Sequence, residues 1–167
     1  MARLPDRDTM MLWSELCWHR DRLVETDSKT GPVCAEHAPS KAGLYRVTWT
    51  GNWPSLAETY RAQATVRISD PTVALTDLRP PVRLSIGRTT DIRKRIRQHF
   101  GSNENNNRML QRLRQICPSK CDEEVRKIAI ENLSIEWVEL PDWIERCLLE
   151  SYGKANERPI FDLDAEH

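Results

Sequence analysis

SIGRTTDIRKRIRQHF, at residues 85–100, contains the end of a strand and a whole helix. Residues just upstream have the composition of a strand, and Gly87 is expected to end it. The spacing of apolar residues becomes helical over 90–100, where Thr90 or Asp91 can cap the first turn. Gly101 then supplies the stop. The stretch therefore predicts a strand followed almost at once by a helix.

Wound as a helix, this stretch separates apolar from basic side chains. Three apolar residues form a stripe that should be buried: Ile92, Ile96 and Phe100. Arg95 and His99, four residues apart, lie together beside one edge of that stripe. Three basic residues lie on the side toward solvent: Arg93, Lys94 and Arg97. Arginine matches a phosphate with two donors and histidine accepts a proton near neutral pH, so Arg95 and His99 either point into a cleft or are ordinary surface residues.

Further strands and helices are predicted on both sides of this stretch. Alternating residues predict strands at GLYRVTWT and SIEWVEL, which occupy residues 43–50 and 134–140. Helices are expected over 8–25, over about 106–116, after Cys121, and over about 142–155. The segment 50–82 is irregular and rich in proline. This order predicts an α+β fold in which helices flank a small sheet.

Length and composition indicate one soluble domain spanning residues 1–167. The chain is 39% hydrophobic and 30% charged, and it lacks the run of about 18 apolar residues that a membrane span requires. Asp6 and Asp8 lie where a signal peptide needs apolar residues, so we expect a cytoplasmic protein with no membrane partner. Trp49, Trp137 and Trp143 fall on expected strand or helix positions and are predicted to pack in the core.

Charge is segregated along the chain although the total is zero. Residues 79–114 hold ten basic side chains against Asp91 and Glu104, an excess of eight positive charges. Residues 121–167 hold thirteen acidic against five basic side chains, an excess of eight negative charges. The first segment either forms a cationic face that attracts a polyanion, or pairs with the second across the fold.

Five motifs together resemble the GIY-YIG nucleases in order and spacing. They are Gly43-Leu44-Tyr45, Ser85-Ile86-Gly87, the run from Arg88 to Phe100, Glu150 in ERCLLESYGK, and Pro159-Ile-Phe-Asp162. The resemblance covers residues 43–162. It implies a small, mostly antiparallel three-stranded sheet flanked by helices, to which this chain adds an N-terminal extension, 1–40, with an extra helix. A long insertion, 50–82, would separate the first two core strands.

The resemblance implies hydrolysis of DNA phosphodiester bonds with one divalent ion, Mg²⁺ or alternatively Mn²⁺. Glu150 would hold the metal, Tyr45 would lie beside the attacking water, and Arg95 would bind the scissile phosphate. His99 would help to activate the nucleophile. Either His99 takes a proton from Tyr45, or the tyrosine hydroxyl passes on the proton of the water. Arg88 would contact phosphate, and the further candidate phosphate contacts are Arg93, Lys94 and Arg97. One carboxylate can suffice for magnesium, because this ion keeps most of its waters.

Two positions depart from the family pattern. Ser85 stands where a tyrosine is usual, and Asp162 where an asparagine is usual. Four residues of the motifs are predicted to support the site without acting in catalysis: Gly43, Ser85, Gly87 and Asp162. The two departures leave open a DNA-binding module with weakened catalysis, and the acidic C-terminal third leaves open an effector that binds a basic partner.

The plan of the chain is closest to the stand-alone restriction endonucleases of this family. The sequence continues for five residues past Asp162, so we expect no separate DNA-binding domain. Sequence preference would then come from 1–40, from 50–82 or from 101–114. Cutting both strands of double-stranded DNA would require two active sites, and hence a homodimer.

Overall fold

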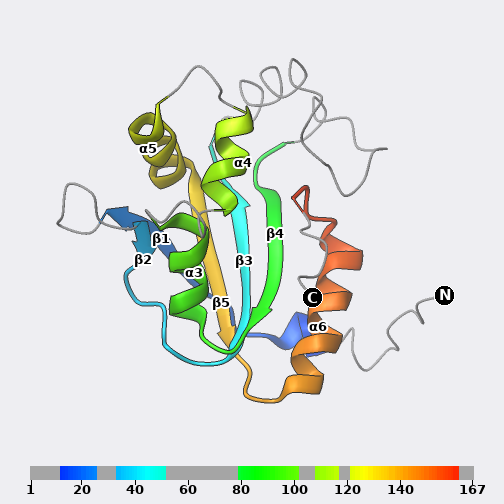
Figure 1. The fold of residues 1–167 in the computed structure, drawn as a ribbon. Coiled ribbons are helices and arrows are strands. Elements are labelled where there is room, and N and C mark those ends of the chain that lie inside the picture. Colours follow the sequence, from blue (N-terminus) through cyan, green and yellow to red (C-terminus); the bar gives the residue numbers. More distant parts are fainter. Residues whose placement is uncertain (1–11, 26–32, 52–78, 102–107, 117–120, 162–167) are drawn as a thin grey trace.

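The computed structural model describes residues 12–25, 33–51, 79–101, 108–116 and 121–161. Within these ranges, five strands form an antiparallel sheet with the order β2-β1-β5-β3-β4 (Figure 1). The strands are β1 (His19–Glu25), β2 (Val33–Ala35), β3 (Gly43–Trp49), β4 (Val82–Thr89) and β5 (Leu133–Glu139). The helices are α3 (Ile92–Phe100), α4 (Arg108–Ile116), α5 (Asp122–Asn132) and α6 (Trp143–Glu157). The α+β class and the antiparallel sheet flanked by helices are confirmed.

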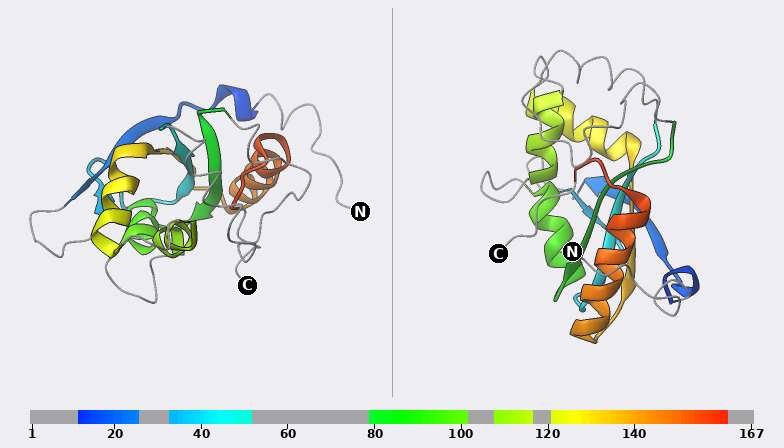
Figure 2. Two further views of the ribbon diagram at one scale, coloured as in Figure 1. Left: turned by 90° about the horizontal axis from the view of Figure 1, so that it is seen from above. Right: turned by 90° about the vertical axis from the view of Figure 1, so that its right-hand side faces the viewer.

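The helices lie on both faces of the sheet. Figure 2 shows α3, α4 and α5 on one side of β4, and α6 on the other. The larger core lies under α3, α4 and α5, where Tyr45, Val47 and Trp49 of β3 point inward. A smaller core joins Leu44 of β3 to Leu149 of α6 on the opposite face. β4 is an edge strand, so α3 and α6 approach each other across it.

Helix α3 has the predicted form. Asp91 is the N-cap and accepts a hydrogen bond from the backbone N–H of Lys94 at 2.7 Å. The N–H of Gly101 closes the helix by donating to the carbonyl of Arg97 at 2.6 Å. All three residues of the predicted apolar stripe are buried. β4 continues through Gly87 to Thr89, however, so the prediction that this glycine ends the strand is wrong.

The predictions of a three-stranded sheet and of a helix over 8–25 are wrong. Only residues 12–15 of the described N-terminal segment are helical, and β1 follows them. β1 pairs with β5, so that His19 lies opposite Trp137. Leu23 points into the larger core, whereas Arg20 reaches Glu136 on the other face. This two-residue alternation suits a strand at the edge of the core better than a helix.

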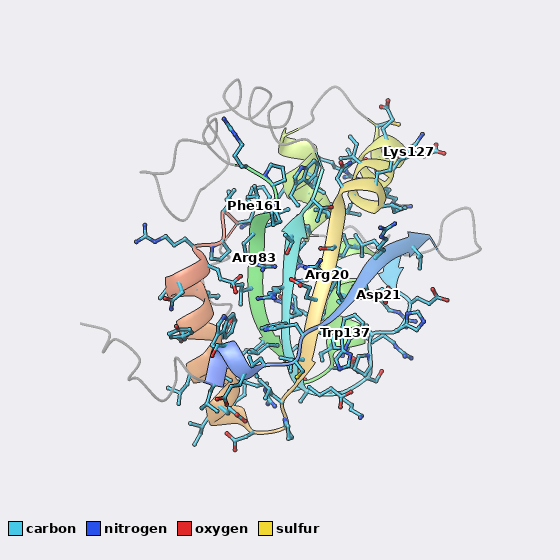
Figure 3. All side chains as sticks on the ribbon, turned by 180° about the vertical axis from the view of Figure 1, so that it is seen from behind. Arg20, Asp21, Arg83, Lys127, Trp137 and Phe161 are labelled. Carbon is cyan, nitrogen blue, oxygen red and sulfur yellow. The ribbon has the colours of Figure 1, made fainter. Side chains whose placement is uncertain are left out.

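Two arginines and two glutamates form a charged cluster on the face of the sheet that carries α6. Arg46 and Arg83 both bind Glu136 of β5 and Glu157 of α6, at 2.5–2.9 Å. Arg20 adds a third contact to Glu136, and Figure 3 shows Arg20 and Arg83 on this side of the sheet. Burial raises the pKa of Glu136, but the three arginines outweigh it and lower that pKa to about 2.

The basic segment 79–114 and the acidic segment 121–167 pair with each other at several places. Arg83 binds Glu157, Arg88 binds Glu150, and Arg114 binds Asp122. Lys94 and Arg97 remain exposed on α3. The pairing alternative is therefore confirmed in part, because three arginines form ion pairs across the fold. A smaller basic surface remains on α3, and its attraction for a polyanion stays a prediction.

Several predictions fall outside the described residues. The insertion between the first two core strands lies there apart from its ends, because the structure does not describe 52–78. Asp162 lies just beyond the last described residue, Phe161. Among the described residues, no helix is both long and apolar enough to cross a membrane.

Candidate active site

A cavity of about 320 Å³ opens where α3 and α6 approach each other across β4. Its walls include Tyr45 of β3, Arg88 of β4, Arg95 of α3, and Glu150 and Lys154 of α6. Three of these charged residues are basic and one is acidic, so the cavity favours an anion. Residues from four separate elements thus converge at one place on the edge of the sheet.

Tyr45, His99 and Arg95 form a connected group at the wall of this cavity. The hydroxyl oxygen of Tyr45 lies 2.7 Å from Nε2 of His99 and accepts a hydrogen bond from Nε of Arg95 at 3.3 Å. Arg95 and His99 are one turn apart on α3, which lets both reach the same phenol. Arg95 also donates from Nη1 to Gln98 at 3.3 Å. Arg95 therefore points into a cleft, as one of the two alternatives from the sequence proposed, whereas His99 is buried beside Tyr45 and does not line the cavity.

The environment of Tyr45 keeps its hydroxyl protonated. Burial raises the pKa of Tyr45 because the phenolate loses its hydration, and the carboxylate of Glu150 adds to this effect. The cations of Arg95 and Lys154 oppose it without reversing it. The influence of Glu150 and Lys154 on this phenol also shows that the α6 side of the cavity is electrostatically coupled to the β3 side.

Gly87 makes room for the phenol of Tyr45. The two residues are direct partners across β3 and β4. A Cβ atom at Gly87 would lie 2.5 Å from the hydroxyl oxygen of Tyr45 and 2.6 Å from Cζ, so any other residue here would displace the phenol. The absence of a side chain at this position therefore lets the phenol reach across the edge strand toward the cavity.

Glu150 is the carboxylate in the cavity wall, and two cations hold it. Oε2 accepts a hydrogen bond from Nη1 of Arg88, and Oε1 lies 3.1 Å from Nζ of Lys154. Glu150 is only 8% exposed. A buried carboxylate is stable only when its charge is compensated, and these two cations provide that compensation.

The donor set suits a largely hydrated Mg²⁺ rather than a metal enclosed by protein ligands. Within the described ranges, no group of three or more histidine, cysteine, aspartate or glutamate side chains could hold an ion. One buried carboxylate beside the Tyr45 hydroxyl fits magnesium, which binds through one or two carboxylates and keeps its waters. The ion would compete with Arg88 for Oε2 of Glu150.

Some of the other predicted site residues line the cavity, and others lie outside it. Ser85 is buried and lines the cavity together with Gly87. Gly43 begins β3, and a Cβ atom there would lie 2.1 Å from the carbonyl oxygen of Val138. The predicted phosphate contacts on α3 do not line the cavity and are exposed: Arg93, Lys94 and Arg97.

Six residues that line the cavity were not among the predicted site residues: Ile86, Thr89, Thr90, Gln98, Trp143 and Lys154. Lys154 follows Glu150 by one helical turn, a spacing that could have indicated its place on the same face of α6. Gln98 lies beside Arg95 on α3. Trp143 is 54% exposed and lines the cavity, so the prediction that it packs in the core is wrong. The same prediction is confirmed for Trp49 and Trp137, which are 2% and 5% exposed.

Comparisons of the chain with protein-family profiles, with curated proteins and with solved structures find no match. The geometry of the cavity and the motifs in the sequence are therefore the features that indicate a function.

Proposed function

We propose that this chain is a divalent-metal-dependent DNA endonuclease of the GIY-YIG type with a compact, restriction-like plan. The observation that carries the proposal is the meeting of Tyr45, Arg95 and Glu150 at one cavity, with buried His99 in contact with Tyr45. Tyr45 contacts both His99 and Arg95, and the Tyr45 hydroxyl shares the cavity with Glu150. Proton transfer, phosphate binding and a carboxylate that can hold a metal are the functions that phosphodiester hydrolysis requires.

The cations of the cavity are suited to a phosphate. Arg95 presents a guanidinium with several donors, of which Nε already binds the Tyr45 oxygen. Arg88 and Lys154 add two positive charges on the opposite wall. Together they would neutralise the charge that grows on the non-bridging oxygens as the phosphate is attacked.

The Tyr45–His99 contact supports a relay for the proton of the attacking water. Arg95 can only donate, so the Tyr45 oxygen accepts from it and keeps its own hydrogen for Nε2 of a neutral His99. Because the pKa of Tyr45 is raised, the residue is a neutral phenol rather than a phenolate before the reaction. Such a phenol can give its proton to His99 while it accepts the proton of the attacking water. Both proton routes considered from the sequence fit this arrangement.

The metal would be held by Glu150, with water as the remaining ligands. When bound, a divalent ion lowers the pKa of a coordinated water and stabilises the leaving oxygen. The role of Arg88 would then change. In the free protein, Arg88 neutralises Glu150. When Glu150 binds the metal, the guanidinium of Arg88 would bind a phosphate of the DNA instead.

The test is a nicking assay on supercoiled plasmid with Mg²⁺ and with EDTA. We expect Mg²⁺-dependent nicking that Glu150→Gln abolishes. Glu139→Gln is the matched control, because Glu139 is an exposed carboxylate that binds Lys41 at 2.7 Å outside the cavity. Retarded but intact plasmid would favour the binding module with weakened catalysis, and no binding at low salt would exclude both.

A further inference from the structure

Trp143 is a large aromatic residue exposed at the cavity. It is the first residue of α6, and 54% of it is accessible. Tryptophan is usually well buried, as Trp49 and Trp137 are in this chain. An exposed indole on the wall of a cationic cavity is therefore a candidate contact for a ligand rather than a part of the core.

Helix α6 presents Trp143, Glu150 and Lys154 along one face. Residues seven and eleven positions apart in a helix lie close to the same line, and all three side chains line the cavity. About 10 Å of helix axis separate Trp143 from Glu150. A DNA strand with a phosphate at Glu150 would thus pass Trp143 within a short stretch of its backbone.

The position of Trp143 is fixed independently of any ligand. Arg146 is buried, lies 5.6 Å from the ring centroid, and donates to the carbonyl oxygens of Leu140 and Pro141 at 2.5 and 2.7 Å. Asp142 caps the helix by accepting from the N–H of Glu145 at 2.8 Å. These hydrogen bonds fix the first turn of α6, which carries the indole. Preorganisation of this kind lowers the entropic cost of binding a planar ligand.

Arg88 links the indole to the anion-binding part of the cavity. Its guanidinium carbon lies 4.7 Å from the centroid of Trp143, while Nη1 binds Glu150. Arg88 thus adjoins the aromatic surface, and Arg95 and Lys154 line the same cavity. Nucleotides match this combination, because a phosphate suits the cations and every base has a face that can stack on an aromatic ring.

We propose that Trp143 stacks on an unpaired or unstacked nucleobase next to the phosphate that enters the cavity. This inference rests on the proposed function and specifies the state of its substrate. A base inside a closed duplex has both faces covered by its neighbours, so the indole can reach only a base at a single-stranded segment, an end, a nick or a distorted site. Trp143 is thus a positioning residue for the nucleotide beside the scissile phosphate.

A purely structural role for Trp143 makes a different prediction. If the indole only holds Arg88 near Glu150, its loss would alter all DNA binding alike, whether the bases are paired or not. Selective loss of binding to unpaired DNA distinguishes stacking from that role.

The experiment measures affinity in EDTA for two DNA molecules, so that no cleavage occurs. One is a single strand that carries the fluorescent base 2-aminopurine, and the other is a relaxed, covalently closed duplex minicircle, which has no ends and no unpaired loop. We expect Trp143→Ala to weaken single-strand binding about tenfold or more, with less than about a twofold change for the duplex. Trp143→Phe should restore most of the affinity, and wild type should quench 2-aminopurine more than Trp143→Ala does.

The matched control is Ile144→Ala, which removes the adjacent apolar side chain. Ile144 is 66% exposed and does not line the cavity, so both affinities should stay unchanged. Thermal unfolding of each variant checks that the fold is retained. Equal weakening of binding to both DNA molecules by Trp143→Ala, or no weakening of either, would overturn the inference.

Failure of the nuclease proposal gives a separate result. If wild type does not nick plasmid but Trp143→Ala still loses single-strand affinity selectively, the protein binds nucleotides without hydrolysing them, and the stacking role of Trp143 stands. If wild type nicks plasmid and the selective loss is missing, the nuclease proposal stands and the stacking role does not.

Discussion

The hydroxyl oxygen of Tyr45 lies 2.7 Å from Nε2 of His99, although the two residues are 54 positions apart in the chain. Both side chains are buried, at 2% and 1% exposure. The contact joins the central part of the sheet to α3 and is shielded from bulk water. A proton can therefore pass between the two groups without competition from solvent.

Tyr45→Phe removes this contact while keeping the ring. We expect the rate of plasmid nicking to fall by about 10²- to 10⁴-fold, because a positioned proton acceptor contributes that much. The free energy of unfolding should fall by about 1–3 kcal/mol, since buried His99 loses a hydrogen-bond partner. Tyr152→Phe is the control, because it makes the same chemical change outside the cavity. Equal nicking rates for the two variants would contradict the proposed relay.

Arg88→Gln tests whether arginine and metal compete for Glu150. Arg88 binds Oε2 of Glu150, and an ion can use that oxygen only after the guanidinium leaves. We expect the variant to bind Mn²⁺ about tenfold more tightly in the absence of DNA, as measured by titration calorimetry, because a charge-assisted hydrogen bond no longer has to be broken. Arg97→Gln removes an equal charge from the exposed side of α3 and should leave this affinity nearly unchanged.

DNA that binds Arg88 removes it from Glu150, and should therefore raise the metal affinity of the wild-type protein. By thermodynamic linkage, metal should raise the affinity for DNA by the same factor. In Arg88→Gln, this coupling should be weaker. A metal affinity that is the same in Arg88→Gln and wild type would show that the Arg88–Glu150 pair does not control access to the carboxylate.

Local patterns in the sequence were sufficient to predict α3 closely. Its stripe, its N-cap at Asp91 and its stop at Gly101 depend on neighbours within four residues, so the sequence contains all the information that decides them. The place of Lys154 beside Glu150 follows from the same helical spacing. Predicting that Glu150 lies near Tyr45 and Arg95 required more than local spacing, and that expectation came from the order of the motifs.

Other features depend on distant partners. The apolar residues of the segment 8–25 have close to helical spacing, yet pairing with β5 makes 19–25 a strand. The ion pairs of Glu136 with Arg20, Arg46 and Arg83 join three other strands, and no short-range pattern indicates them. Trp143 occupies an ordinary helical position, and nothing in its local sequence distinguishes this 54% exposed side chain from a buried one.

The basic side of α3 is expected to add affinity for DNA without selecting a sequence. Lys94 and Arg97 are exposed and lie outside the cavity, so they can bind phosphates of the flanking DNA. Lys94→Ala and Arg97→Ala should each reduce the slope of log affinity against log salt concentration by about 0.9 for duplex DNA, because each contact releases counterions. Lys127→Ala, on the exposed face of α5, is the control. If all three variants keep the wild-type slope, α3 does not contact the DNA backbone.

The Glu136 cluster predicts how stability depends on pH. Because the pKa of Glu136 is lowered from 4.5 to about 2 in the folded protein, its carboxylate stabilises the fold fully above pH 4.5, and this contribution is lost as the pH falls toward 2. We expect Glu136→Gln to reduce the free energy of unfolding at pH 7 by about 3 kcal/mol, since three arginines lose their shared anion. The difference from wild type should shrink as urea-unfolding curves are measured from pH 5 down to pH 2.5.

Glu139→Gln should show no such convergence, because Glu139 is exposed and pairs only at the surface with Lys41. A wild-type advantage that stays constant across this range would mean that the charge of Glu136 is not what stabilises this face of the sheet.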